Sequence, residues 1–144
     1  MRFPQFSVGE DLYFQQMYML MANRYFVCSL PLYVYCQNER SAIHTFNVHK
    51  LLDAANAQEA VYCDAIRMHL LSGVEKEFET VYYIRGFSFY VRQMMILGEF
   101  DKDAPEYQVL RRRLLNHFPN IKNNPYILAD QSPENMEMFA LLSE

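Results

Sequence analysis

Two adjacent carboxylates at the start of a predicted helix are the sharpest chemical feature of this 144-residue chain. The run Ser7-Val8-Gly9-Glu10 fits a capping box, with Ser7 as N-cap and Glu10 at the third helical position, and Asp11 follows directly. The helix dipole and the free N–H groups of a first turn favour an ionised carboxylate, which is the form that acts as a general base. Acidic residues are also common in first turns for structural reasons, and the spacing alone favours that interpretation.

The elements around this pair mix a helix with extended segments. We expect a helix from about Gly9 to Asn23, followed by two short strands, Tyr25–Cys28 and Leu32–Tyr35, and a polar loop from Gln37 to Ser41. Two such strands cannot form a stable sheet alone. They need a larger sheet, or a cover of helices, to pack against.

From Asn47 onward the apolar spacing predicts helices. One runs from Asn47 to a stop near Gly73, and a second from Val74 to Leu97, where Gly98 ends it. The second is expected to carry five apolar positions: Phe78, Val81, Tyr82, Phe89 and Met95. Asp103 is expected to cap a third helix, and Ser132 a short last one.

The predicted fold class is therefore mainly α with a small α/β piece at the N-terminus. Residues 1–46 form that piece, a helix plus two short strands, and residues 47–144 form a helical tail of about four helices.

Charge and cysteine content exclude several classes of protein. The net charge of −4 argues against a general nucleic-acid binder. We interpret Arg111–Arg113, the basic cluster, as a solvated helix face, with a phosphate or anionic membrane contact as the alternative. Cys28, Cys36 and Cys63 form no CxxC pair and are expected to be buried. The first residues lack the apolar core of a signal peptide, so a reduced cytoplasmic setting is expected.

Histidines and aromatic residues offer weaker candidates. His44 and His49 could bind a metal, but no cysteine or carboxylate completes a set, so they are interpreted as surface residues. An aromatic cluster could stack on sugar rings, although helix core is the favoured interpretation; it comprises Tyr82, Tyr83, Phe87, Phe89 and Tyr90.

The order of several segments resembles that of a known family. Gly9-Glu10-Asp11 opens a helix, Pro31-Leu32-Tyr33-Val34-Tyr35 follows as an extended segment, Ser41 lies in the next loop, and the tail contains Phe118–Tyr126. This set is similar to the C-terminal part of bacterial family 2 glycosyltransferases of the GT-A type. The resemblance covers residues 2–46 well and the rest loosely.

The resemblance implies an inverting sugar transfer. A carboxylate would deprotonate the acceptor hydroxyl, which attacks the anomeric carbon, and the family's base matches Asp11, with Glu10 beside it. Substrate contacts would come from three residues, Tyr35, Arg40 and Ser41. In some GT-A enzymes a late histidine helps to hold the metal, which makes His44 a minor candidate.

Other features depart from the family. Cys36 and Asn38 stand where the family often has arginines that plausibly face the donor diphosphate, and the D-x-D triplet Asp101–Asp103 lies out of order between two helices. The part of the family that binds the sugar nucleotide has no counterpart in these residues. We therefore expect a chain that is inactive alone and holds no cofactor, with Mg²⁺ or Mn²⁺ in the intact enzyme.

The intact enzyme would move a sugar from a nucleotide donor to a glycan or lipid-linked acceptor. It would do so in surface-polysaccharide synthesis at the cytoplasmic membrane face, with peripheral membrane association. The missing half would come from a longer chain or a partner chain. The alternative hypothesis is a stand-alone helical interaction module, whose many Tyr, Phe and Met side chains form a surface for a protein partner.

Overall fold

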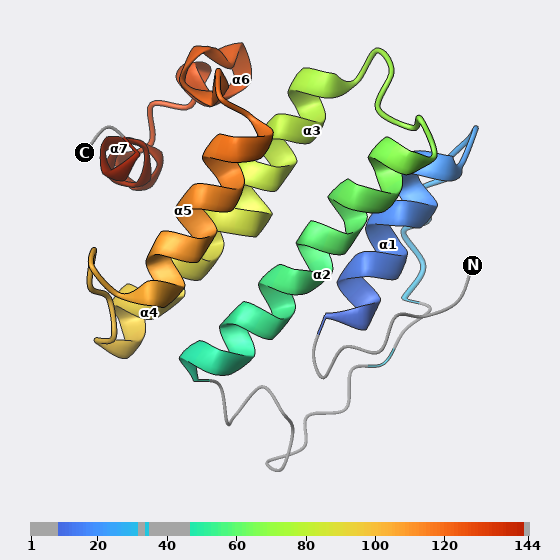
Figure 1. Ribbon diagram of the computed structural model, residues 1–144. Helices are drawn as coiled ribbons and strands as arrows, with labels where there is room; N and C mark the ends of the chain where they lie inside the picture. Colours follow the sequence, from blue (N-terminus) through green and yellow to red (C-terminus); the bar gives the residue numbers. More distant parts are fainter. Residues whose placement is uncertain (1–8, 32–33, 35–46, 143–144) are drawn as a thin grey trace.

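The computed structural model describes residues 9–31, 34 and 47–142, and the regular elements among them are all helical (Figure 1). In chain order they are α1 (Glu10–Met21), α2 (Val48–Arg67), α3 (Glu75–Tyr82), the π-helix η2 (Tyr83–Ser88), α4 (Phe89–Leu97), α5 (Pro105–His117), the 3₁₀ turn η3 (Ile121–Asn123), α6 (Pro125–Ala129) and α7 (Pro133–Leu141). No helix among these residues is both long and apolar enough to cross a membrane.

Helix α2 lies between the two sides of the molecule. Helix α1 packs along it on one side, and η2, α4 and α5 contact it on the other (Figure 1). Helices α6 and α7 lie at the far edge, beyond α5, near the C-terminus. One hydrophobic core includes residues of all these helices.

The first helix begins at a glycine that packs directly against α2. Gly9 is the N-cap of α1 and has a φ of 96°, in the left-handed region. A Cβ atom at this position would lie 3.0 Å from Cβ of Ala57 and 3.3 Å from Cα of Ala54. The prediction that Ser7 is the N-cap is therefore wrong: the helix begins at Glu10, its N-cap is Gly9, and no side chain among the described residues caps it.

The first of the two predicted strands is also wrong, and the second lies mostly outside the described residues. No described residue belongs to a strand, and Tyr25–Cys28 is irregular and exposed. Of Leu32–Tyr35, only Val34 lies within the described residues, and it is exposed and irregular. The physical reason is that a strand needs a neighbouring strand to bond its backbone groups and a second layer to cover its apolar face. An isolated pair of short strands lacks both.

The helix predicted over 74–97 is present, but the spacing of its buried residues changes part-way along it. Phe78 and Tyr82 are buried as predicted, whereas Phe89 is 46% exposed and Val81 40% exposed. A turn of the π-helix η2 holds about one residue more than a turn of an α-helix. As a result, the buried face continues at Tyr90 in place of Phe89.

The ends of the other helices agree only in part with those predicted from the sequence. The side chains of Asn47 and Ser132 cap α2 and α7 through the N–H groups of Lys50 and Asn135. Helix α2 ends at Arg67, earlier than predicted, and turns connect it to α3. The N-cap of α5 is Ala104, so the prediction that Asp103 caps it is wrong.

We predict that Gly9→Ala lowers the free energy of unfolding by more than the matched substitution Gly73→Ala. Both glycines have positive φ, but nothing lies within 4 Å of a Cβ at Gly73. The left-handed conformation alone costs alanine about 1–2 kcal/mol, and only Gly9→Ala adds a clash with α2. Urea denaturation of both variants measures the difference, and equal losses would contradict the close-packing explanation.

Candidate functional site

The predicted base and its neighbour lie on the exposed first turn of α1. Both Glu10 and Asp11 are exposed, and Oδ1 of Asp11 accepts a hydrogen bond of 2.7 Å from the N–H of Leu12. The position places two carboxylates at the positive end of a helix, as the sequence predicted. The pair therefore has the solvent access that an acceptor hydroxyl would need.

Polar contacts hold α1 against α2 in the turns that follow this acidic pair. The hydroxyl of Tyr13 donates to Asp64, and burial together with this bond raises the pKa of Tyr13 to about 12. One turn further on, the amides of Gln16 and Gln58 donate to each other at 2.6 and 3.1 Å. Since Gln58 is fully buried, this reciprocal pair satisfies amide groups that would be costly to leave alone. The acidic turn thus belongs to a helix with a fixed position.

The remaining predicted site residues cannot be placed beside the acidic pair. Tyr35, Arg40, Ser41 and His44 lie outside the described residues. Their proposed contacts with substrate or metal stay predictions.

A second polar cluster joins three helices through one carboxylate. Glu59 of α2 accepts a hydrogen bond of 2.5 Å from the hydroxyl of Tyr82 in α3, and its other oxygen lies 2.7 Å from Nε2 of His117 in α5. The ring of Tyr62 packs on the imidazole, with 4.0 Å between the ring centres. Burial, followed by the bond to Glu59, raises the pKa of Tyr82, so this tyrosine remains a hydrogen-bond donor.

This Glu59 cluster borders a hollow of about 460 Å³ but brings no activated nucleophile to it. The hollow is lined by Tyr62 and His117 together with exposed residues such as His69 and Glu75. Cys63, four residues after Glu59 on α2, has a pKa raised by partial desolvation and by the charge of Glu59, so it stays protonated at neutral pH. The geometry indicates a connection between helices more than a catalytic centre.

No pattern in the sequence predicted the Glu59 cluster. Glu59 and His117 are 58 residues apart, and neither stands in a motif. The spacing of Glu59 and Tyr62 on one helical face was the only local signal, and it does not specify a histidine partner.

We predict strong coupling between Glu59 and Tyr82 in stability. Glu59→Ala leaves the buried Tyr82 hydroxyl without its acceptor, which should cost about 1–3 kcal/mol of unfolding free energy. In a chain that already carries Glu59→Ala, Tyr82→Phe should lower the free energy of unfolding by less than it does in the unmodified chain. A double-mutant cycle by denaturant unfolding measures this coupling, and additive losses would show that the bond contributes nothing.

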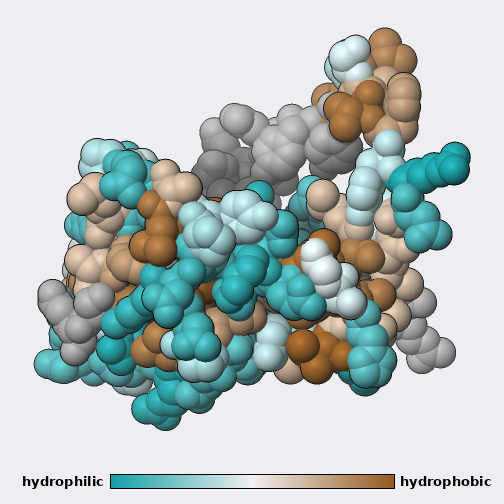
Figure 2. Space-filling view, turned by 90° about the horizontal axis from the view of Figure 1, so that it is seen from above, coloured by the Kyte–Doolittle hydropathy of each residue, from teal (hydrophilic) through white to brown (hydrophobic). Residues whose placement is uncertain are grey.

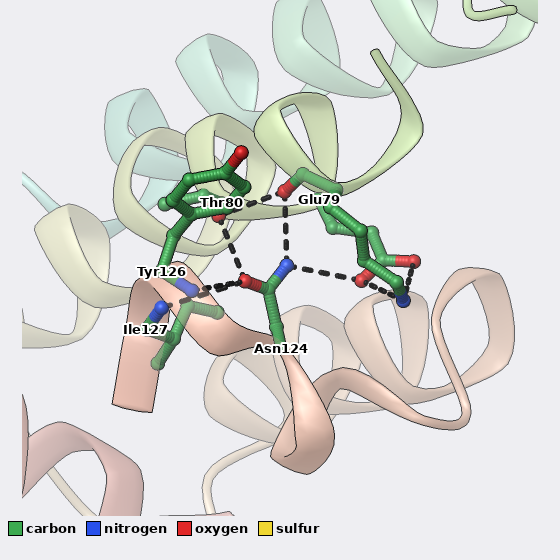
Figure 3. A network of polar contacts seen from close by, with 6 residues as sticks. Glu79, Thr80, Asn124, Tyr126 and Ile127 are labelled. Atoms are coloured by element: carbon green, nitrogen blue, oxygen red, sulfur yellow. Dashed lines mark hydrogen bonds and ion pairs between the residues drawn. The ribbon is translucent and has the colours of Figure 1, made fainter. Parts of the chain in front are cut away.

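The tail segment that resembles the glycosyltransferase family contains a buried asparagine with a structural role (Figure 3). The side-chain oxygen of Asn124 accepts from the N–H groups of Tyr126 and Ile127, capping α6, and from the hydroxyl of Thr80. Its amide donates to the carbonyl of Lys76 at 2.9 Å and to the carboxylate of Glu79 at 3.1 Å. One fully buried side chain therefore joins α3 to α6.

We expect Asn124→Ala to lower the free energy of unfolding by about 2–4 kcal/mol, because it removes a helix cap and leaves buried polar groups unpaired. Asn123→Ala is the matched control, since Asn123 is the exposed neighbour in the same turn, and it should change stability by less than about 0.5 kcal/mol. Thermal and urea unfolding compare the two, and similar effects would refute the role given to Asn124.

Other predictions from the sequence have mixed outcomes. In the aromatic cluster, Tyr82, Tyr83, Phe87 and Tyr90 are buried, which confirms the core interpretation for all but Phe89. The burial predicted for Cys28 and Cys63 is wrong, since both are exposed; Cys36 lies outside the described residues.

The arginine cluster is only partly a solvated face. Arg112 is exposed, but Arg111 is half-buried and donates to the carbonyl of Leu142. Nη1 of the half-buried Arg113 is enclosed and has no hydrogen-bond partner among the described residues.

Comparisons with family models, curated proteins and solved structures find no match for this chain. Within the described residues, no group of three or more His, Cys, Asp or Glu side chains comes together in a way that could hold a metal ion.

Proposed function

We propose that this chain is the acceptor-side and C-terminal segment of a nucleotide-sugar-dependent glycosyltransferase that acts in glycan or surface-polysaccharide synthesis. The observation that carries the proposal is the position of Glu10 and Asp11. Both are exposed on the first turn of a helix that is anchored to α2 through its later residues. The order of the sequence segments supplies the family, and the anchored acidic turn is compatible with the role that the family implies.

In this proposal Asp11 removes the proton from the acceptor hydroxyl while that oxygen attacks the anomeric carbon of the donor sugar. The bond from this carbon to the nucleoside diphosphate breaks in the same step, and the nucleoside diphosphate leaves. The helix start favours the ionised form that a base needs, and Glu10 adds a second negative charge beside it. The nucleotide, and a divalent metal such as Mg²⁺ or Mn²⁺, would be held by the donor-binding half. The enzyme would act at the cytoplasmic face of the membrane on a glycan or lipid-linked acceptor.

The predicted strands no longer support this proposal. They were part of the segment order that resembles the family, and the described residues do not form them. The proposal therefore rests on the acidic turn and on the order of the segments in the sequence.

The second candidate is a helical protein-interaction module, and a different observation favours it. Large apolar side chains are exposed along α1 and the segment that follows; they are Phe14, Tyr18, Met19, Met21, Tyr25, Phe26, Val27 and Leu30. A group of this size is characteristic of a surface that another protein covers.

For the first candidate we predict that Asp11→Asn lowers turnover about 100- to 10,000-fold in any longer, active form that contains this segment, because it removes the general base. Glu134→Gln is the matched control, since Glu134 is likewise an exposed acid in a first helical turn, that of α7, and it should leave turnover unchanged. A radiolabelled-sugar transfer assay measures both. Activity that survived Asp11→Asn would show that the base is another residue.

Two observations separate the candidates. An in-frame continuation of the DNA upstream of Met1 that encodes strands and a D-x-D motif supports the transferase, whereas a stop codon with a close ribosome site supports the module. The 144-residue chain alone should transfer no sugar and bind UDP weakly or not at all. Sugar transfer or tight UDP binding by this chain would contradict the proposed division of roles.

A further inference from the structure

An apolar groove lies beside the C-terminal half of α1. Its volume is about 380 Å³, and its walls come from α1, from the connection between α2 and α3, and from α3. Its apolar lining includes Met19, Leu20, Tyr25, Leu70, Phe78 and Val81. Since a wall residue such as Met19 is 53% exposed, the groove has an unfilled apolar surface.

The segment that follows α1 carries apolar side chains that contact little of the helical body. Phe26 is 91% exposed and Val27 92% exposed, and Leu30 is 65% exposed. Figure 2 shows hydrophobic residues gathered on a part of the chain that stands away from the body on the α1 side. Tyr25 lines the groove, but Phe26, the next residue, does not. The exposed pair Phe26–Val27, called here the apolar projection, is therefore outside the groove of its own chain.

Backbone and charge add to this picture. No backbone hydrogen bond joins Tyr25, Phe26 or Val27 to another part of the described chain. Arg24, next to the projection, is exposed and has no ion-pair partner among the described residues. Glu77, exposed at the wall of the groove, has a pKa lowered by the hydrogen bond from Tyr126 and is therefore a stable negative charge.

We propose that the occupant of the groove is the apolar projection of a second copy of this chain, in a two-fold symmetric dimer. In such an isologous interface the same patch serves both subunits. Each projection would enter the groove of the other copy, and each Arg24 would lie near the partner copy's glutamate at the groove wall. The inference concerns the 144-residue chain and does not depend on whether that chain belongs to a glycosyltransferase.

Sedimentation velocity of the intact chain over a wide concentration range tests the proposal. We expect a monomer–dimer equilibrium, weakened at least about 10-fold by Phe26→Ser in the projection and by Val81→Glu in the groove. Ile96→Ser is the matched control, since Ile96 is 73% exposed on α4, which lies away from α1 in Figure 1. This control should leave the dissociation constant unchanged. Circular dichroism checks that each variant is folded, which we expect because the replaced residues are exposed.

A second test exchanges two charges between the subunits, so its result does not depend on the loss of apolar surface. Arg24→Glu and Glu77→Arg should each weaken the dimer, and the double variant should restore most of the loss. A monomer at every concentration would overturn the proposal and leave the groove to a different protein. A dimer that Phe26→Ser does not weaken, or a double variant no better than the single ones, would overturn it as well.

Discussion

The distance between α1 and α2 determines where the other features of the N-terminal side lie. Gly9 approaches Ala54 and Ala57 so closely that a β-carbon would be in steric conflict, and alanines on α2 leave room for the helix. Because α1 begins at this contact, the acidic turn lies at the first end of α1 and the apolar groove lies beside its other end. The proposed substrate-facing and partner-facing surfaces are thus the two ends of one helix that packs against α2.

Buried and half-buried polar side chains add specificity to this packing. Gln58 pairs with Gln16, Glu59 joins Tyr82 to His117, and Asn124 joins α3 to α6. Each links elements that are far apart in sequence. A buried polar group is costly without its partner, so a shift of one helix relative to another would break several such contacts together. Apolar side chains alone are more tolerant of such shifts.

The sequence predicts most helices of the tail, because their apolar spacing and several caps are local signals. Ser132 opens the last helix as expected, Asn47 stands at the start of α2 as its cap, and Gly98 ends α4 in the left-handed conformation. The N-terminal piece is different, since whether Tyr25–Cys28 forms a strand depends on a neighbour that the segment itself does not specify. Local patterns could not reveal the partner of Glu59 either.

The candidate site was partly predictable for the same reason. A carboxylate pair at a helix start is a local pattern, so Glu10 and Asp11 could be located in advance. What holds them in place is a contact between α1 and α2 that only the folded chain shows. The position of Gly9 as N-cap results from that contact and overrides the capping pattern of Ser7.

The π-helix has a consequence for how this chain tolerates changes in length. Along α3 the buried positions Phe78 and Tyr82 are four residues apart, and a regular helix would continue that face to Gly86 and then to Phe89. The extra residue in η2 brings Tyr90 there instead. Deleting one residue within Tyr83–Ser88 would remove the extra residue and restore a regular helix. Tyr90 would then take the place of residue 89 in that helix, which lies on the same buried face. The turn is therefore a place where the chain can lose one residue and keep its buried face, whereas the same deletion within the regular turns of α4 would turn every later side chain by about 100°.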